Sequence, residues 1–152
     1  MHHDEASSWN RHLALPGAAG WLAVLQVEEQ RTRRHGGDHG LVLVRLDDRA
    51  GAPALELAAA AISGTIRDID FLALVDPHTF AVLALHCEDL ASLVGRLRRA
   101  FDYLGFTGTA LIDGRPAGAD LRAVWEAMSR SRAVEPAGPH IDFVASSPLS
   151  LN

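Results

Sequence analysis

The side chains best suited to binding a ligand are arginines, and they gather in two places. The clusters are Arg31, Arg33 and Arg34, and Arg96, Arg98 and Arg99. Because a guanidinium carries a fork of N–H donors, one or two of them in the right place can hold a small anion. Two solvated helix faces are the simpler explanation. No Ser/His/Asp or Cys/His set indicates a nucleophile, and the eight histidines lack metal-site spacing.

Composition narrows the class of protein. The 152 residues, 48% hydrophobic and 22% charged, suit one compact soluble domain. A net charge of −5 argues against a general nucleic-acid binder. No apolar run approaches a membrane span and no leader opens the chain, so we expect a cytoplasmic protein without membrane contact. The single cysteine, Cys87, lies in an apolar stretch and is expected to be a buried thiol.

Hydrophobic periodicity predicts the elements that must position these residues. Helices are expected over about 21–34, 53–66, 90–101 and 121–128, and strands over 41–46, 69–75, 80–86 and 106–112. The sequence Asp76-Pro77-His78-Thr79 predicts a tight turn that joins the second and third strands. This order is typical of a ferredoxin-like α+β sandwich with a mainly antiparallel sheet. Residues 1–12 are expected to form a flexible N-terminal tail, 13–133 the domain, and 134–152 a C-terminal extension.

Several short motifs occur in an order that resembles one family. Before the first strand stands Arg33-Arg34-His35-Gly36, and Arg45-Leu46-Asp47 ends that strand. Arg67-Asp68-Ile69-Asp70, five residues and the turn 76–79 follow. Weaker matches are Leu15 to Trp21, Gly108-Thr109-Ala110 and Val124 to Arg132. Together they resemble the GGDEF domain of bacterial diguanylate cyclases over about residues 13–133, which implies the nucleotide-cyclase palm fold.

The resemblance also implies that the family's chemistry is lost. GGDEF cyclases join two GTP molecules with Mg²⁺, held by the first acid of an Asp-x-Asp element and an acid of the signature turn. Arg45 and His78 stand at those positions, and neither suits Mg²⁺. Asp76 and Pro77 replace the signature glycines and Thr79 its last acid, while Asp47 alone keeps an acidic position. We therefore expect a vestigial site with no metal, no cofactor and no cyclase activity. Asp47 is expected to be a solvated carboxylate paired with Arg45.

One family site keeps its residue types. Arg67 and Asp70 match the Arg-x-x-Asp motif by which the family binds its product, cyclic di-GMP. A guanidinium matches phosphate and guanine acceptors, and a carboxylate matches guanine donors. The following helix would supply a second arginine, Arg98 or Arg99. An ordinary local ion pair is the alternative, and the two differ in whether Arg67 and Asp70 face solvent together.

Two functions from different classes remain open. The first is an inactive regulatory or interaction domain that senses cyclic di-GMP through Arg67 and Asp70. The second is a structural module without a nucleotide ligand, which acts by dimerisation or by docking on another regulatory protein. A nucleotide hydrolase that uses the altered pocket is a weaker alternative, which carboxylates clustered near Asp47 and Asp76 would favour.

Overall fold

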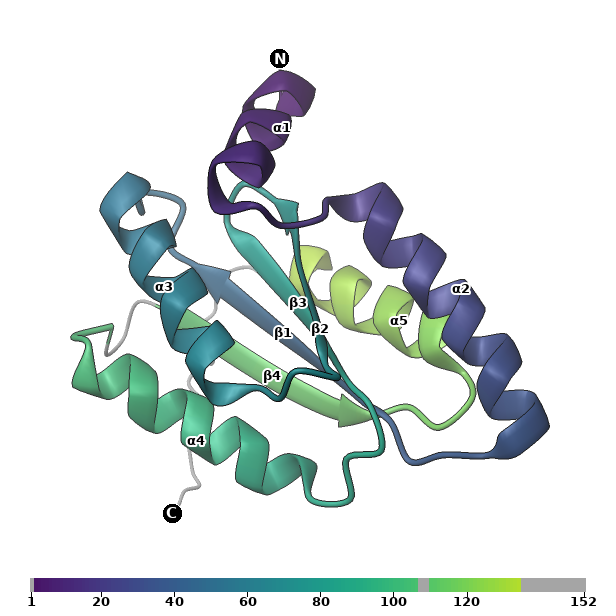
Figure 1. Ribbon diagram of the computed structural model, residues 1–152. Coiled ribbons are helices and arrows are strands. Elements are labelled where there is room, and N and C mark those ends of the chain that lie inside the picture. The colour runs from purple at the N-terminus through teal and green to yellow at the C-terminus, as the bar shows by residue number, and fades with distance from the viewer. Residues whose placement is uncertain (1, 107–109, 135–152) are drawn as a thin grey trace.

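The protein is a three-layer α+β sandwich, described by a computed structural model over residues 2–106 and 110–134 (Figure 1). A four-stranded sheet in the order β2-β3-β1-β4 forms the middle layer, and each neighbouring pair is antiparallel. The strands are β1 (Gly40–Leu46), β2 (Phe71–Asp76), β3 (Thr79–Ala84) and β4 (Ala110–Pro116). Helices α3 (Ala52–Thr65) and α4 (Leu90–Tyr103) cover one face, and α2 (Ala18–His35) and α5 (Leu121–Val134) cover the other.

The continuous apolar run of β1 follows from its central position. Successive side chains of a strand point to opposite faces, so both faces of a covered strand need apolar residues. Val42, Val44 and Leu46 pack with α3 and α4. Leu41 and Leu43 pack with α2 and α5. The predicted ferredoxin-like α+β arrangement with an antiparallel sheet is confirmed.

The fourth strand begins later than the sequence pattern predicts. β4 starts at Ala110 rather than at Phe106. Gly105 has a φ of 87°, and the Phe106 N–H donates to the carbonyl of Phe101 at 2.8 Å. Phe106 therefore completes the C-terminal turn of α4 instead of pairing in the sheet. Gly108 and Thr109, expected in this strand, lie outside the described residues.

The N-terminal segment corrects the prediction of a tail. Residues His2–Leu13 form helix α1, and the chain after it reaches the outer edge of β2. Asn10 Nδ2 donates to the carbonyls of Pro16 and Leu74, each at 3.0 Å, and Leu74 N donates to the Pro16 carbonyl at 2.9 Å. Because β2 is an edge strand, these bonds satisfy backbone groups that would otherwise lack a partner strand.

The predicted C-terminal extension, residues 134–152, lies almost entirely outside the described residues. Residues 135–152 lie outside the described part of the chain, so the predicted extension is represented only by Val134. Within the described residues, no helix combines the length and apolar character that crossing a membrane requires.

Candidate functional site

The structure brings Arg45 and the turn 76–79 together at one end of β1. Arg45 Nη1 donates to Thr79 Oγ1 at 3.0 Å, and the two residues are register partners in β1 and β3. Arg45 Nη2 bonds Asp48 Oδ1 at 2.6 Å, and Nη1 lies 3.7 Å from Asp76 Oδ1. The Leu46 N–H donates to the His78 carbonyl at 2.8 Å. We call Arg45, Leu46, Asp48 and the turn 76–79 the Arg45 end of β1.

The turn itself is closed by its own first residue. Asp76 pairs with Thr79 in the β2–β3 ladder, which leaves Pro77 and His78 at the tip. Asp76 Oδ1 accepts the His78 N–H at 2.9 Å, a short-range bond that favours a turn at this point. The predicted hairpin between the second and third strands is confirmed.

Asp47 takes a different partner from the one expected. The sequence predicts a pair with Arg45, but Asp47 accepts the Arg49 N–H at 2.8 Å and the Arg49 guanidinium at 3.2 Å. These bonds lower the pKa of the Asp47 carboxyl. Asp47 and Asp76 thus serve different arginines, so the carboxylates are divided between two cations rather than clustered as a metal site requires.

The arrangement at the Arg45 end places a fixed positive charge between two carboxylates, Asp48 and Asp76. The Arg45 side chain is 27% exposed, and its two terminal nitrogens already have partners. Over the described residues, no group of three or more His, Cys, Asp or Glu side chains is placed to hold a metal ion. The cluster is a polar contact that ties β1 to the β2–β3 turn.

Arg67 and Asp70 lie at the opposite end of β2, and they bind each other. Asp70 Oδ2 accepts the Arg67 backbone N–H at 2.9 Å, and Oδ1 accepts Arg67 Nη2 at 3.1 Å. Asp70 Oδ1 also accepts the Leu85 N–H at 3.1 Å, and Arg67 Nη2 donates to the Leu85 carbonyl. The Asp70 side chain is only 2% exposed, while that of Arg67 is 50% exposed. The carboxylate is thus occupied by its own chain, and only the arginine faces solvent.

The predicted second arginine does not join this pair. Arg98 Nη2 donates to the carbonyl of Ile112 in β4 at 3.3 Å, and burial lowers the pKa of its guanidinium. Ile112 pairs with Val44, whereas Leu85 follows Ala84, the register partner of Gly40. Four residues of strand separate those positions by about 13 Å along β1. Arg99 is exposed on α4, and within the described residues it has no recorded contact with Arg67 or Asp70.

Two further polar side chains near the start of β1 escaped sequence reasoning. Glu29 Oε1 accepts Arg122 Nε at 2.7 Å, and Oε2 accepts the Arg122 N–H in the first turn of α5 at 2.8 Å. Burial alone would raise the pKa of Glu29, but the donors of Arg122 outweigh it and lower the pKa. The signal was present, since Glu29 continues the buried stripe of Trp21 and Leu25.

His39, directly before β1, is the second missed residue. Its side chain is buried between the C-terminal half of α2 and the loop that follows β3, and its ring contacts Thr32 and His86. We call His39, Glu29, the Arg67–Asp70 pair and residues 85–87 the His39 end of β1. The sequence could not predict the burial of His39, because a single polar residue before an apolar strand forms no recognisable pattern.

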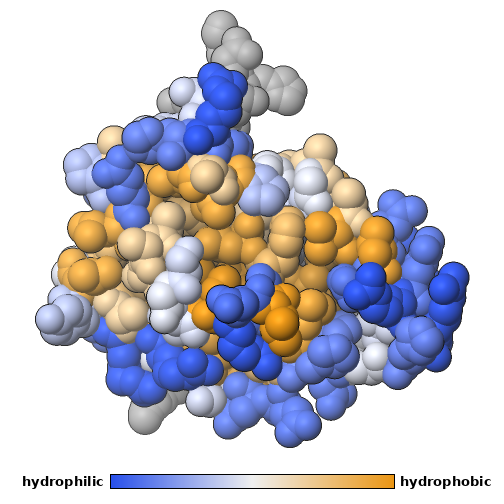
Figure 2. All heavy atoms as spheres, viewed as in Figure 1, coloured by the Kyte–Doolittle hydropathy of each residue, from blue (hydrophilic) through white to orange (hydrophobic). Residues whose placement is uncertain are grey.

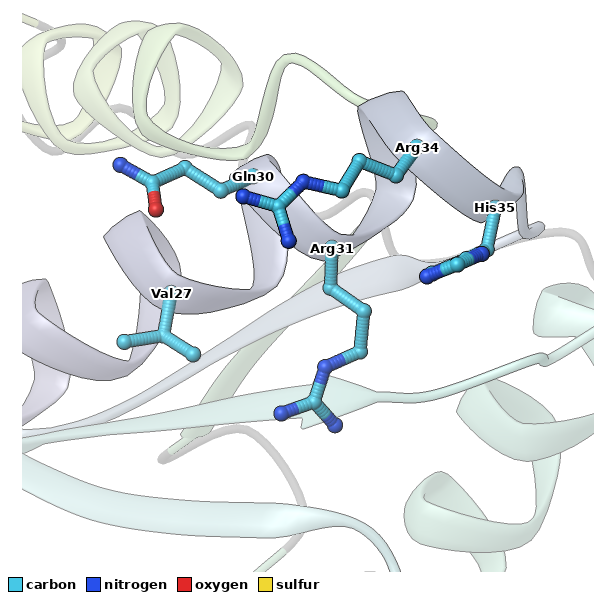
Figure 3. Close-up of a pocket in the computed structure, with 5 residues that line it drawn as sticks. All are labelled: Val27, Gln30, Arg31, Arg34 and His35. Carbon is cyan, nitrogen blue, oxygen red and sulfur yellow. The ribbon is translucent and has the colours of Figure 1, made fainter.

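The outer face of α2 offers a surface rather than a pocket. From Ala18 to Gln30 its exposed residues carry no charge, and Leu22 and Val27 are about half exposed. A hollow of about 250 Å³ lies further along, between Val27, Gln30, Arg31, Arg34 and His35 (Figure 3). Much of the middle of the molecular face seen in Figure 2 is apolar as well. Exposed apolar surface beside basic side chains is typical of a protein contact.

Comparison with known proteins identifies the fold. No protein-family model and no curated protein matches the chain. Among solved structures, a DGC protein from Thermotoga maritima matches with a TM-score of 0.66 and 15% identity over 78% of this chain and 94% of that one. The chain has the fold of a GGDEF domain. The predicted nucleotide-cyclase palm is thereby confirmed.

Two other solved structures share this fold. The diguanylate cyclase SiaD from Pseudomonas aeruginosa, solved with its activator SiaC, matches with a TM-score of 0.59 and 21% identity over 77% of this chain and 56% of that one. The GGDEF domain of DgcB from Caulobacter crescentus, solved with c-di-GMP, matches with a TM-score of 0.58 and 13% identity over 78% of this chain and 86% of that one. Likeness at this level of identity establishes a common fold.

Proposed function

We propose that this chain is a regulatory domain with the GGDEF fold that acts by protein contact and does not make cyclic di-GMP. The observation that carries the proposal is Arg45. Its guanidinium stands between Asp48 and Asp76 at the position where the family resemblance calls for a metal-binding acid. A permanent cation repels Mg²⁺, and the bonds to Thr79 and Asp48 hold it there.

Contact with a partner is supported by the outer face of α2. Its uncharged first turns suit an apolar surface, and Arg31 and Arg34, which line the hollow beside Val27, suit carboxylates. The proposed partner surface is therefore apolar and acidic, on another regulatory protein or on a second copy of this chain. That the diguanylate cyclase SiaD forms a complex with an activator protein shows such regulation in one protein of this fold.

A cyclic di-GMP receptor is the second candidate, and Arg67 is the observation in its favour. Half of its side chain is exposed next to Asp70, in the family's Arg-x-x-Asp order. The receptor requires Asp70 to accept guanine N–H groups. That carboxylate would first have to give up the Leu85 N–H and the Arg67 donors, at the cost of leaving a partly buried backbone N–H without its acceptor. The geometry therefore favours the contact module.

The two candidates are separated by isothermal titration of cyclic di-GMP into the wild-type protein and into Arg67→Ala. We expect no binding heat with either protein. Binding at low micromolar concentration that disappears in Arg67→Ala would establish the receptor instead. Incubation with GTP and Mg²⁺ should yield no cyclic di-GMP, and measurable turnover would overturn the proposal that the domain is inactive.

A further inference from the structure

His39 connects two loops that meet beside β1. Its Nδ1 accepts the His86 N–H at 3.0 Å, and its Nε2 lies 2.9 Å from Thr32 Oγ1. The Cys87 N–H donates to the Asp38 carbonyl at 2.6 Å, next to this contact. The ring of His39 thus links residues 85–87, which follow β3, to α2 and to the loop before β1.

These bonds assign one protonation state to His39. Thr32 Oγ1 donates its hydroxyl proton to the Glu28 carbonyl at 2.6 Å, so it accepts from His39 Nε2. Nδ1 accepts a backbone N–H, and a protonated Nδ1 has no lone pair with which to accept. The ring is therefore neutral, with its proton on Nε2.

The groups around His39 act on its pKa in opposite directions. Burial lowers the pKa of His39, and so does the His86 ring, whose centre lies 5.0 Å away. Glu28 of α2 and Asp38 of the preceding loop raise the pKa, but the net direction is downward. Thr32 is uncharged, and the connection from β4 to α5 contributes only the Ala117 N–H, which donates to the His39 carbonyl at 3.0 Å.

We propose that His39 is a proton-sensitive latch, which holds residues 85–87 against α2 and the loop before β1 when neutral and releases them when protonated. Protonation removes the acceptor of the His86 N–H and places a cation against a second imidazole. His86 has a φ of 49°, a left-handed conformation that is costly for a residue other than glycine, so its backbone relaxes once the bond is lost. This inference goes beyond the proposed function and does not depend on it.

Release of the latch would reach the Arg67–Asp70 pair. Leu85, the residue before His86, is held by Asp70 through its N–H and by Arg67 through its carbonyl. The N–H and the carbonyl of Leu85 and the N–H of His86 are therefore all held by ionisable side chains. Of these three side chains, His39 is the one whose ordinary pKa lies closest to neutral pH. A drop in pH would free the His86 N–H, while Arg67 and Asp70 still hold Leu85.

The test is hydrogen exchange at the His86 amide, followed by NMR between pH 7.5 and pH 5. Because the open state binds a proton that the closed state excludes, the protection factor should fall about tenfold per pH unit below the ordinary histidine pKa of about 6.5. His39→Asn keeps an acceptor near Nδ1 that cannot be protonated, so its protection factor should not change with pH. Equal pH dependence in the wild type and His39→Asn would overturn the proposal.

Two controls keep the result interpretable. His35→Asn alters an exposed histidine at the end of α2 and should leave the pH dependence unchanged. Nitrogen chemical shifts of the His39 ring in the wild-type protein need no variant. They should show an Nε2-protonated ring at neutral pH that titrates below the usual histidine range, and a fully charged ring at pH 6.5 would contradict the latch even if His39→Asn failed to fold.

Discussion

The two ends of β1 are both polar, but they differ in the partners of their charged groups. At the Arg45 end the guanidinium of Arg45 bonds only to other side chains and lies partly in solvent, as with Asp48. At the His39 end a buried Asp70 and a buried His39 accept N–H groups of the backbone, those of Leu85 and His86. Buried acceptors of this kind hold the chain path itself, so the His39 end should govern stability and the Arg45 end should not.

This difference also separates a matching motif from a working site. Arg67 and Asp70 have the residue types and spacing of a ligand site, yet the Asp70 carboxylate is used to hold the segment after β3. Arg45 stands where the family resemblance implies a metal ligand, and it donates to Thr79 of the turn 76–79. In both places the side chains that resemble a site bond to groups of the protein itself.

The sharpest test of the comparison is Asp70→Ala. Its removal leaves the backbone N–H groups of Leu85 and Arg67 without their acceptor and takes the counter-charge from the Arg67 guanidinium. We expect a loss of about 3 kcal/mol in the free energy of unfolding. Urea denaturation monitored by circular dichroism measures this loss. Asp68→Ala, an exposed neighbour in the same motif, should change stability by less than about 0.5 kcal/mol. Equal effects of the two variants would remove the distinction between buried and exposed carboxylates.

A second test at the same end is Glu29→Gln. The variant removes the charge that anchors α5 to α2 through Arg122 and should cost about 2 kcal/mol. Because the folded-state pKa of Glu29 lies below its unfolded value, the contribution is complete above the unfolded pKa and disappears as pH falls through the folded one. Urea titrations at pH 7 and pH 3.5 should therefore show the variant's deficit shrinking in acid. A deficit that is the same at both pH values would contradict this role.

Much of the fold followed from the sequence because it depends on local pattern. Short apolar runs and helical repeats identify the four strands and helices α2 to α5, and Asp76-Pro77 identifies the hairpin turn. Helix α1 could not be found in this way, because its position depends on Asn10 reaching Leu74, which is far away in sequence. The start of β4 was predicted too early because the left-handed Gly105 lets the Phe106 N–H bond to the Phe101 carbonyl at the end of α4.

The sequence predicted which residues lie together at the candidate site, but not which hydrogen bonds and ion pairs they form. The sequence groups Arg45 with the turn 76–79, and the strand register brings them together. Which acid each arginine takes is decided by backbone geometry, so Asp47 binds Arg49 rather than Arg45. The burial of Asp70 likewise depends on Leu85, which comes close to Asp70 only when β3 pairs with β2.

A smaller effect is expected for Asn10→Ala on the edge of β2. The variant loses two hydrogen bonds from one amide to the carbonyls of Pro16 and Leu74, and the Leu74 carbonyl becomes open to water rather than buried. We expect a loss of about 1 kcal/mol in urea denaturation. Asn10→Asp keeps the shape but replaces the donor by an acceptor, so it should destabilise at least as much. No change in either variant would mean that the N-terminal segment does not stabilise the edge strand.

The smallest effect should come from Arg45→Ala at the Arg45 end. Its ion pairs are partly solvated, and the exposed carboxylates of Asp48 and Asp76 stay hydrated when the guanidinium is removed. We expect a loss of less than about 1 kcal/mol, which 0.5 M NaCl should reduce further by screening. Arg49→Ala, which removes the guanidinium beside Asp47, is the matched exposed control. A loss as large as that of Asp70→Ala would show that the Arg45 end is as structural as the His39 end, and the contrast between them would have to be given up.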